Sequence, residues 1–373
     1  MRLPAPSPLL HPLRYLCGYL IGLIIVCLWP FNFWQSNQAS WSHEGGLRFV
    51  APAIACTVSP PAKLTGLKQF TLLLHLFSEI PEEASWIIGY GLDYESFNFM
   101  VGQQWNQLVF EIRTGGTQPP TQVRVNKPFE RKTKVWIAVV CDGLHLSTYL
   151  DGEKKIEVST EEFDNSSWTP ASPLVLGCGT NGKFPWNGTI YEMAVIDRAA
   201  THDEMRDPFM FLQTSSAVLH YTFNEGVGRV VADHGKMEPA DLTVPEKFQP
   251  AVRPVLVSPQ SYWLPAPMHW DVIGNIIGFI PLGILLAAVL AKRGVAPSIV
   301  IVITLFATCG FSTALELLQA YLPARWSSTT DVLTNTFGGG LGALLYSLGL
   351  IKKGVNIMRL SFRETEGSGK KVN

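Results

Sequence analysis

Four long apolar runs divide the chain, and a long region of shorter, alternating runs separates the first from the other three. The apolar runs occupy residues 13–29, 272–291, 297–318 and 332–351. A helix needs about 20 apolar residues to cross the hydrocarbon core of a bilayer, and the first run, with about 17, is at the short end of that range. We therefore predict four transmembrane helices. The flanking residues 1–12 and 352–373 are expected to form a short N-terminal segment and a polar tail.

The first apolar run has two interpretations. A basic start, here with Arg2 and Arg14, followed by an apolar core is common to cleaved signal peptides and to uncleaved signal anchors. The core is followed by Trp29, Pro30 and Phe31 rather than by a small-x-small cleavage pattern. The pattern favours an anchor that stays in the membrane.

Between residues 40 and 258 the pattern changes to short alternating runs bounded by turn residues, which is typical of β-strands. The clearest expected strands are Phe70–Phe77, Trp86–Tyr90, Leu108–Arg113, Lys134–Cys141, His145–Leu150, Lys155–Val158, Leu174–Gly177 and Gly188–Ile196. Asp151-Gly152 predicts a type I′ hairpin turn, because both central residues of that turn need positive φ. Many short strands in one domain favour a two-layer sandwich. The predicted fold class is α + β multidomain, a four-helix transmembrane bundle with an inserted all-β sandwich.

The expected strands resemble a known fold in order and spacing. Trp136–Val140, Leu146–Gly152, Leu174–Gly177 and Trp186–Ala199 are similar to successive strands of a laminin G or concanavalin A-like jelly roll. Leu219–Gly228 also resembles a strand of such folds, although it stands late in the domain instead of opening it. The resemblance implies carbohydrate binding, in some members with Ca²⁺ held by loop oxygens.

Candidate ligands for such a calcium ion are the polar loop residues Asp93, Asp142, Asp164, Asn165 and Asn181. Trp168 and Trp186 are candidates for stacking on a sugar, provided that they are exposed. The alternative interpretation is that the aspartates and asparagines are turn residues and that the tryptophans belong to the core or its rim.

Cysteine usage and net charge argue against a disulfide framework, a Cys/His metal site and a nucleic-acid partner. Cys56, Cys141 and Cys178 lie in the predicted sandwich, and three cysteines allow at most one internal disulfide. No CxxC or Cys/His metal spacing is present, so we expect mostly packing cysteines. The net charge is −1 and no basic patch stands out, which argues against a nucleic-acid partner.

The distribution of Lys and Arg predicts the orientation, since cytoplasmic flanks of membrane helices are enriched in these residues. Arg14, Lys292-Arg293 and Lys352-Lys353 would all be cytoplasmic if both termini are inside. The expected location is the plasma (inner) membrane, multi-pass, with the sandwich on the extracytoplasmic side. Arg325 would be an exception on the outer side.

Polar residues gather at the predicted outer ends of the apolar runs. The pattern D-V-x-x-N-x-x-G occurs twice, from Asp271 to Gly278 and from Asp331 to Gly338. Residues three and four apart share a helix face, so each pattern would form one stripe of polar and small side chains. The proposed ligand-binding residues at this level are Asn32, Asp271, Asn275, Glu316, Gln319, Arg325, Asp331 and Asn335.

The catalytic candidates among them are Asp271, Glu316 and Asp331. The two aspartates have an alternative role as N-terminal helix residues, which the helix dipole favours. That explanation does not cover Glu316, which lies near the end of its run, where the same dipole disfavours a negative charge. Glu316 therefore needs a partner, and Arg325 is the nearest cation in sequence.

These residues also resemble the motifs of the VanZ-like family, in the same order. The matching residues are Asp271, Asn275, Phe279, Pro281 and Gly283, then Glu316 and Gln319, then Asp331, Asn335 and Gly338, with Trp29-Pro30-Phe31-Asn32 at the end of the first run. The resemblance implies a three-span region over residues 268–351 that joins the first span, with the sandwich as an insertion. The family is associated with low-level resistance to the glycopeptide teicoplanin, and this association names no reaction.

Two functions follow. The first is a membrane protein of the cell envelope that handles a lipid or lipid-linked glycan at its outer-face polar site, while the lectin-like domain binds envelope polysaccharide. The second is a non-enzymatic glycan-binding or adhesion protein whose polar bundle residues are structural. A phosphate ligand would need a divalent cation such as Ca²⁺ or Mg²⁺ between Asp271, Glu316 and Asp331, because only Arg325 is near. No Ser-His-Asp or Cys-His pattern is present, and whether the protein is an enzyme stays open.

Overall fold

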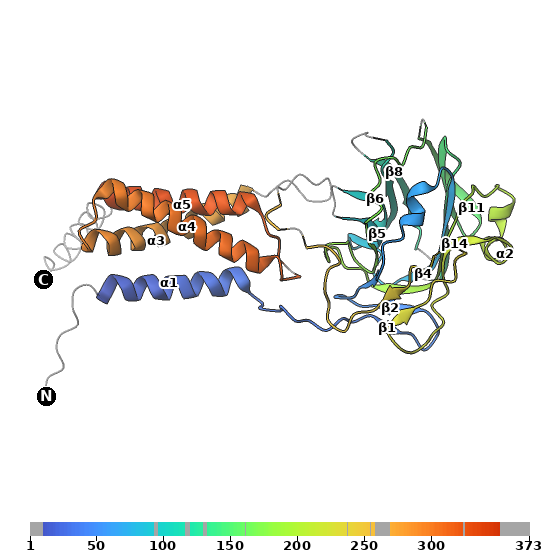
Figure 1. Cartoon of the computed structure of the whole chain (residues 1–373), viewed down its shortest axis with the longest axis horizontal. Coiled ribbons are helices and arrows are strands. Elements are labelled where there is room, and N and C mark those ends of the chain that lie inside the picture. The colour runs from blue at the N-terminus through green and yellow to red at the C-terminus, as the bar shows by residue number, and fades with distance from the viewer. Residues whose placement is uncertain are drawn as a thin grey trace, which may run out of the picture. The chain divides into compact units, whose positions relative to one another are not determined.

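The computed structural model describes residues 10–92, 96–115, 120–129, 133–160, 162–236, 238–253, 255–257, 269–323 and 325–350 (Figure 1). Two compact units divide the chain. Trp34–Arg253 forms one, and Met1–Phe33 together with Pro254–Asn373 forms the other. The second unit is therefore discontinuous in sequence, and the first is inserted into it.

The discontinuous unit contains helices α1 (Leu10–Leu28), α3 (His269–Lys292), α4 (Pro297–Gln319) and α5 (Thr329–Ser347). Within the described residues, only α3 and α4 are long and apolar enough to cross a membrane, and α1 contributes a shorter apolar stretch, Pro12–Leu28. Polar residues and glycines lower the hydropathy of α5. The four-span bundle is thus supported for two helices, and spanning by α1 and α5 stays a prediction.

The four helices pack side by side (Figure 1). A shared apolar cluster joins α1 to α3, α4 and the turn that follows α4; its buried members are Leu16, Leu28, Phe279, Leu282, Leu315 and Leu322. Helix α5 approaches α3 so closely that a Cβ at Gly338 would overlap the carbonyl oxygen of Ile276. A Cβ at Gly342 would likewise overlap the carbonyl oxygen of Ile280. Small residues allow such close backbone packing between membrane helices.

The inserted unit is a sandwich of two antiparallel sheets (Figure 1). The first sheet has the order β1-β2-β13-β4-β9-β10-β11, with β14 paired to β13. Its strands are β1 (Ser40–Trp41), β2 (Leu47–Phe49), β4 (Phe70–Ser78), β9 (Val135–Cys141), β10 (His145–Leu150), β11 (Glu153–Ser159), β13 (Gly188–Ile196) and β14 (Ala217–Tyr221).

The second sheet has the order β15-β16-β3-β12-β5-β6-β7-β8. Its strands are β3 (Ala55–Thr57), β5 (Ser85–Gly91), β6 (Phe97–Gln104), β7 (Gln107–Ile112), β8 (Thr121–Asn126), β12 (Leu174–Leu176), β15 (Val230–Val231) and β16 (Leu242–Thr243). Two short 3₁₀ segments, η1 (Ala62–Gly66) and η2 (Glu204–Arg206), and helix α2 (Pro208–Thr214) complete the unit.

All eight strands that the alternation predicted are present, with ends that shift by at most a few residues. The predicted type I′ turn is confirmed, since Asp151 has φ 48° and Gly152 has φ 84°. Strand β6 was not predicted, because it is buried on both faces over most of its length and therefore shows no alternation. Strand β8 was also missed.

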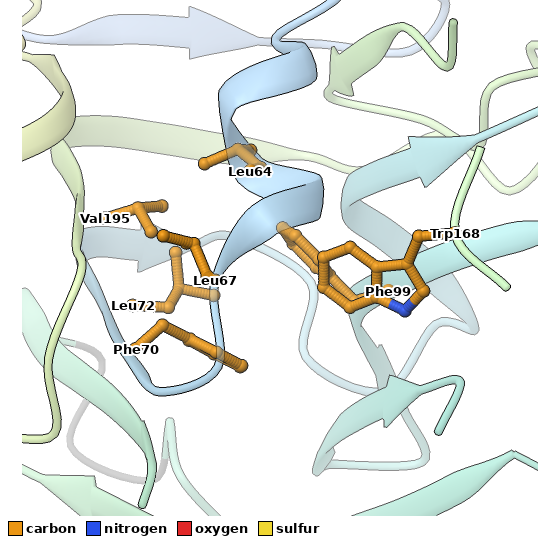
Figure 2. Close-up of a pocket in the computed structure, with 7 residues that line it drawn as sticks. All are labelled: Leu64, Leu67, Phe70, Leu72, Phe99, Trp168 and Val195. Atoms are coloured by element: carbon orange, nitrogen blue, oxygen red, sulfur yellow. The ribbon is translucent and has the colours of Figure 1, made fainter. Parts of the chain in front are cut away.

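The core lies between the two sheets and is apolar. A cavity under η1 is lined by Leu64, Leu67, Phe70, Leu72, Phe99, Trp168 and Val195, which all contribute apolar surface (Figure 2). The cysteines of the described residues are free thiols, and Cys141 and Cys178 are buried. Burial raises the pKa of the Cys141 thiol to about 11, so this cysteine is a packing residue.

Candidate ligand-binding site

The sequence-predicted polar residues meet at one end of the helices. Helices α1 and α4 end there, and α3 and α5 begin there. Asn275 comes from the first turns of α3, Glu316 and Gln319 from the last turn of α4, and Asp331 and Asn335 from the start of α5. The packing of these helices brings together residues that are up to 299 positions apart in the sequence, as in the hydrogen bond between Arg325 and Val26.

Glu316 has a partner that the sequence did not suggest. Its side chain is almost fully buried, and its Oε2 accepts a hydrogen bond of 2.8 Å from the backbone N–H of Ser328. Ser328 is the N-cap of α5, and its Oγ accepts from the N–H of Thr330 at 3.2 Å. The Glu316 carboxylate is disfavoured by the negative C-terminal end of the α4 dipole. It lies at the positive N-terminal end of the α5 dipole, which favours a negative charge.

Arg325 and Gln319 both bind backbone carbonyls at the C-terminal end of α1 and just beyond it. Arg325 donates from Nε to the carbonyl of Trp29 at 3.2 Å and from Nη2 to that of Val26 at 2.9 Å. Gln319 donates from Nε2 to the carbonyl of Cys27 at 2.9 Å. The final carbonyls of a helix have no partners within the helix, and a cation there is favoured by the dipole. These side chains tie α1 to the chain around the end of α4.

In the helical unit, two buried amide oxygens have no donor within the described residues. Asn335 donates from Nδ2 to Ser312 Oγ at 2.9 Å, but its Oδ1 accepts no hydrogen bond. The Oδ1 of Asn32, just beyond α1, is also buried and unpaired. Buried polar atoms are nearly always paired in folded proteins, so each of these acceptors calls for a water or a ligand that donates.

The two aspartates are more open to solvent. Asp331 is half-buried and is hydrogen-bonded to the side chain of Asn275, while Asp271 is exposed and lies within electrostatic range of Asp331. Asp331 is also within electrostatic range of Glu316. Among the described residues, no group of three or more His, Cys, Asp or Glu side chains is arranged to hold a metal ion. A divalent cation between Asp271, Glu316 and Asp331 stays a prediction.

The calcium and sugar candidates of the sandwich are mostly structural. Asp142 accepts from the backbone N–H groups of Leu144 and His145, and Asp164 caps Ser166. Burial acts to raise the pKa of Asp142, but those hydrogen bonds outweigh it and hold the pKa below its usual range. Such contacts are those of turn residues.

The remaining candidates follow the same trend. Asn165 donates to the carbonyl of Leu67, and Asn181 accepts from the N–H of Lys183. Asp93 lies outside the described residues. The prediction that Trp168 and Trp186 stack on a sugar is wrong. These residues are only 6% and 0% exposed, and their side chains pack in the core between the sheets. Large aromatic side chains are buried in the core where the two sheets leave room for them.

One exposed aromatic residue of the sandwich was missed by sequence reasoning. Trp105, in the turn between β6 and β7, is 74% exposed. The sequence signal was the run Gln103-Gln104-Trp105-Asn106-Gln107, which places an aromatic residue among amide side chains between two strands.

Comparisons with known proteins match both units. A family model described as VanZ/LLP1 matches residues 218–352, and one described as the concanavalin A-like lectin/glucanases superfamily matches residues 57–206. Protein VanZ of Enterococcus faecium is 37% identical over 90 residues, which are 24% of this chain and 51% of that protein. The chain thus covers about half the length of this relative.

Solved structures similar to this chain include carbohydrate-binding proteins. The CBM40 of a Ruminococcus gnavus IT-sialidase is 16% identical with a TM-score of 0.34, covering 39% of this chain and 84% of that one. A putative carbohydrate-binding protein from Bacteroides ovatus is 16% identical with a TM-score of 0.37, covering 57% and 61%. At these scores the likeness is too weak to assign a ligand to this chain.

Proposed function

The chain carries a VanZ/LLP1 domain joined to a concanavalin A-like β-sandwich, and from this premise we propose a two-part function in the cell envelope. The polar cluster at the helix ends binds the headgroup of an envelope lipid or lipid-linked glycan. The sandwich binds carbohydrate, such as an envelope polysaccharide.

The unpaired buried acceptors carry the first part of this proposal. The Oδ1 atoms of Asn32 and Asn335 need hydrogen-bond donors, and the buried Glu316 carboxylate accepts only one hydrogen bond, from Ser328, within the described residues. Hydroxyl groups of a sugar or glycerol, or the ammonium of an amino headgroup, supply donors of this kind. A bare phosphate supplies none when it is ionised and would be repelled by the carboxylates.

The membrane orientation belongs to the same proposal. Arg14 lies near the start of α1 and Lys292-Arg293 at the end of α3, so these cations are at the helix ends opposite to the polar cluster. Cytoplasmic flanks carry such residues. The cluster and the sandwich would then be extracytoplasmic, with both termini in the cytoplasm of a plasma-membrane protein.

A structural role for the cluster is the second candidate. The hydrogen bonds of Gln319 and Arg325 to α1 join helices directly, and interhelical contacts of this sort stabilise membrane proteins by roughly 0.6–2 kcal/mol each. In that case the helices are an anchor, and the sandwich alone carries the function as a glycan-binding or adhesion module.

A Glu316→Gln substitution separates the two candidates, because it removes the charge and keeps the shape. Lipids retained by the purified, detergent-solubilised protein would be measured by mass spectrometry. We expect the variant to fold in normal yield and to lose the retained lipid by about tenfold or more, as hydrogen bonds to charged groups contribute about 1.5–3 kcal/mol.

Gly278→Ala is the matched control, because a Cβ at Gly278 meets open space in the same bundle. Equal retention of one lipid by the wild type and by folded Glu316→Gln would reject the headgroup site. A lower folded yield with unchanged lipid retention would instead favour the structural role.

A further inference from the structure

The turn between β6 and β7 holds a tryptophan in an unusual backbone conformation. Trp105 has φ 49° and Asn106 has φ 59°. Type I′ turns need positive φ at both central residues and favour Asn, Asp and Gly, while a bulky residue at positive φ is a true outlier. An indole that is 74% exposed buries little surface on folding. Backbone strain of this kind gathers at ligand-binding sites.

The turn is held in place by its surroundings. The N–H of Trp105 donates to the carbonyl of Glu82 at 3.2 Å, and the N–H of Asn106 donates to that of Pro81 at 3.0 Å. The carbonyl of Asn106 accepts from the N–H of Lys127 at 2.8 Å. The indole is thus presented by a backbone that is fixed on both sides, which lowers the entropy lost when a ligand binds.

A ladder of polar side chains adjoins this turn. Gln104, Gln107 and Asn126 lie in one cross-strand row of β6, β7 and β8. Arg124 donates from Nη1 to Gln104 Oε1 at 3.0 Å and to Gln107 Oε1 at 3.2 Å, and Gln107 donates from Nε2 to Asn126 Oδ1 at 2.7 Å. The buried Oδ1 of Asn106 accepts no hydrogen bond within the described residues.

The ladder continues inward along β8 and β7. Arg124 donates from Nε to Gln122 Oε1 at 2.6 Å, and Gln122 donates to the buried carboxylate of Glu111. Each of these side chains is oriented by the next, so their remaining donors and acceptors have defined directions. Strand β8 is the edge of its sheet, and the labels β6 and β8 in Figure 1 mark this part of the sandwich.

We propose that Trp105 and the ladder formed by Gln104, Gln107, Arg124 and Asn126 are a saccharide-binding site. The indole stacks on the apolar face of a pyranose ring, and the amide and guanidinium groups bind the hydroxyl groups around it. Amide side chains both donate and accept hydrogen bonds, as sugar hydroxyls do. This site rests on the proposed carbohydrate function of the sandwich and gives it a location.

A membrane surface is the other ligand class that an exposed tryptophan suits, because indole rings are enriched at membrane interfaces. The neighbours of Trp105 favour the saccharide. Three amides and one guanidinium, fixed by mutual hydrogen bonds, match a ligand that carries many hydroxyl groups.

The test compares variants of the full-length, detergent-solubilised protein on an array of oligosaccharides that includes N-acetylglucosamine–N-acetylmuramic acid fragments. Trp105→Gly removes the indole and places glycine at a positive φ, where glycine is favoured. We expect its Tm to equal or exceed that of the wild type, while its affinity for the bound glycan falls about tenfold or more, as for other lost stacking contacts.

Two further variants serve as controls. Trp105→Phe keeps an aromatic face and should retain most of the binding. Trp34→Ala removes a tryptophan that is 78% exposed elsewhere in the same unit and should leave binding unchanged.

The outcomes separate the site from the function. Full glycan binding by Trp105→Gly would reject this site and leave the carbohydrate function of the sandwich intact. A wild type that binds no saccharide would reject both. Brominated-lipid quenching of tryptophan fluorescence in nanodiscs that is lost in Trp105→Gly, without any glycan binding, would make the turn a membrane contact and overturn the proposal.

Discussion

Asp233, which follows β15, collects four donors on one buried carboxylate. Lys63 donates from Nζ at 2.6 Å, and the backbone N–H groups of His220, Gly235 and Ala240 donate at 2.9, 2.9 and 3.0 Å. Burial acts to raise the pKa of Asp233, but the hydrogen bonds from Lys63 and the three amides outweigh it and hold the pKa below its usual range. One side chain thus fixes the loop between β14 and β16 to η1.

Replacing Asp233 by Asn should therefore destabilise the sandwich strongly. The substitution leaves the ammonium of Lys63 buried without its counter-charge, and breaking a buried pair typically costs about 3–5 kcal/mol. The measurement is the thermal unfolding of the sandwich, followed by tryptophan fluorescence. Asp197→Asn is the matched control, because the Asp197–Lys236 pair is about 40% exposed and such pairs contribute roughly 1 kcal/mol or less.

The ion pair between Asp233 and Lys63 also predicts how the stability of the sandwich changes with pH. A carboxyl whose folded pKa is depressed stabilises the fold above its unfolded pKa, about 3.9 for Asp, and loses that contribution as the pH falls through the folded pKa. The unfolding free energy of the wild type should decline in this acidic range more steeply than that of Asp233→Asn. Parallel pH profiles would contradict the role assigned to Asp233.

At the scale of elements, the contact between α3 and α5 depends on glycine more than on the polar stripe. The sequence pattern placed Gly278 and Gly338 at equivalent positions of two similar helices, but they differ in the structure. Gly338 and Gly342 lie against the α3 backbone, whereas a Cβ at Gly278 would meet nothing within 4 Å. In α3 the tight position is Gly283, which faces Gly339.

Gly342→Ala should consequently separate α5 from α3 and lower the stability of the helical unit. Overpacking of this kind typically costs about 1–3 kcal/mol. The readout is the Tm and the monodisperse yield of the purified protein in detergent. Gly278→Ala should behave like the wild type, and equal losses for both variants would mean that the close approach of α5 to α3 is not what stabilises the unit.

At the scale of the whole molecule, the sandwich is inserted in the sequence between α1 and α3. The chain leaves the end of α1, forms the sandwich and returns to the start of α3. If both helices cross the bilayer, the sandwich and the polar helix ends must share a compartment. The flanking cations favour the extracytoplasmic side.

Reporter fusions check this topology. Alkaline phosphatase fused after Arg253 should be active, because it would be exported, and the same enzyme fused after Gly294 should be inactive. Green fluorescent protein should give the opposite pattern at these two positions. Active phosphatase at Gly294 would contradict the orientation and would place the Glu316 cluster on the cytoplasmic side.

The sequence by itself determined the features that follow from local patterns. Apolar runs predicted α3 and α4, alternation predicted eight strands, and Asp151-Gly152 predicted a type I′ turn, because each depends on residues close together in the chain. The motif residues at the helix ends were also visible. Their order along the chain matches the domain that the comparisons support.

Only the tertiary structure decided which groups meet. Glu316 is paired with the N-terminus of α5 instead of with Arg325, and Arg325 binds the end of α1. Trp168 and Trp186 are core residues, while Trp105 is exposed. Burial and hydrogen-bond partners depend on segments that are distant in sequence, and no local pattern carries that information. The backbone N–H of Ser328 can donate to the Glu316 carboxylate only when α5 packs beside α4.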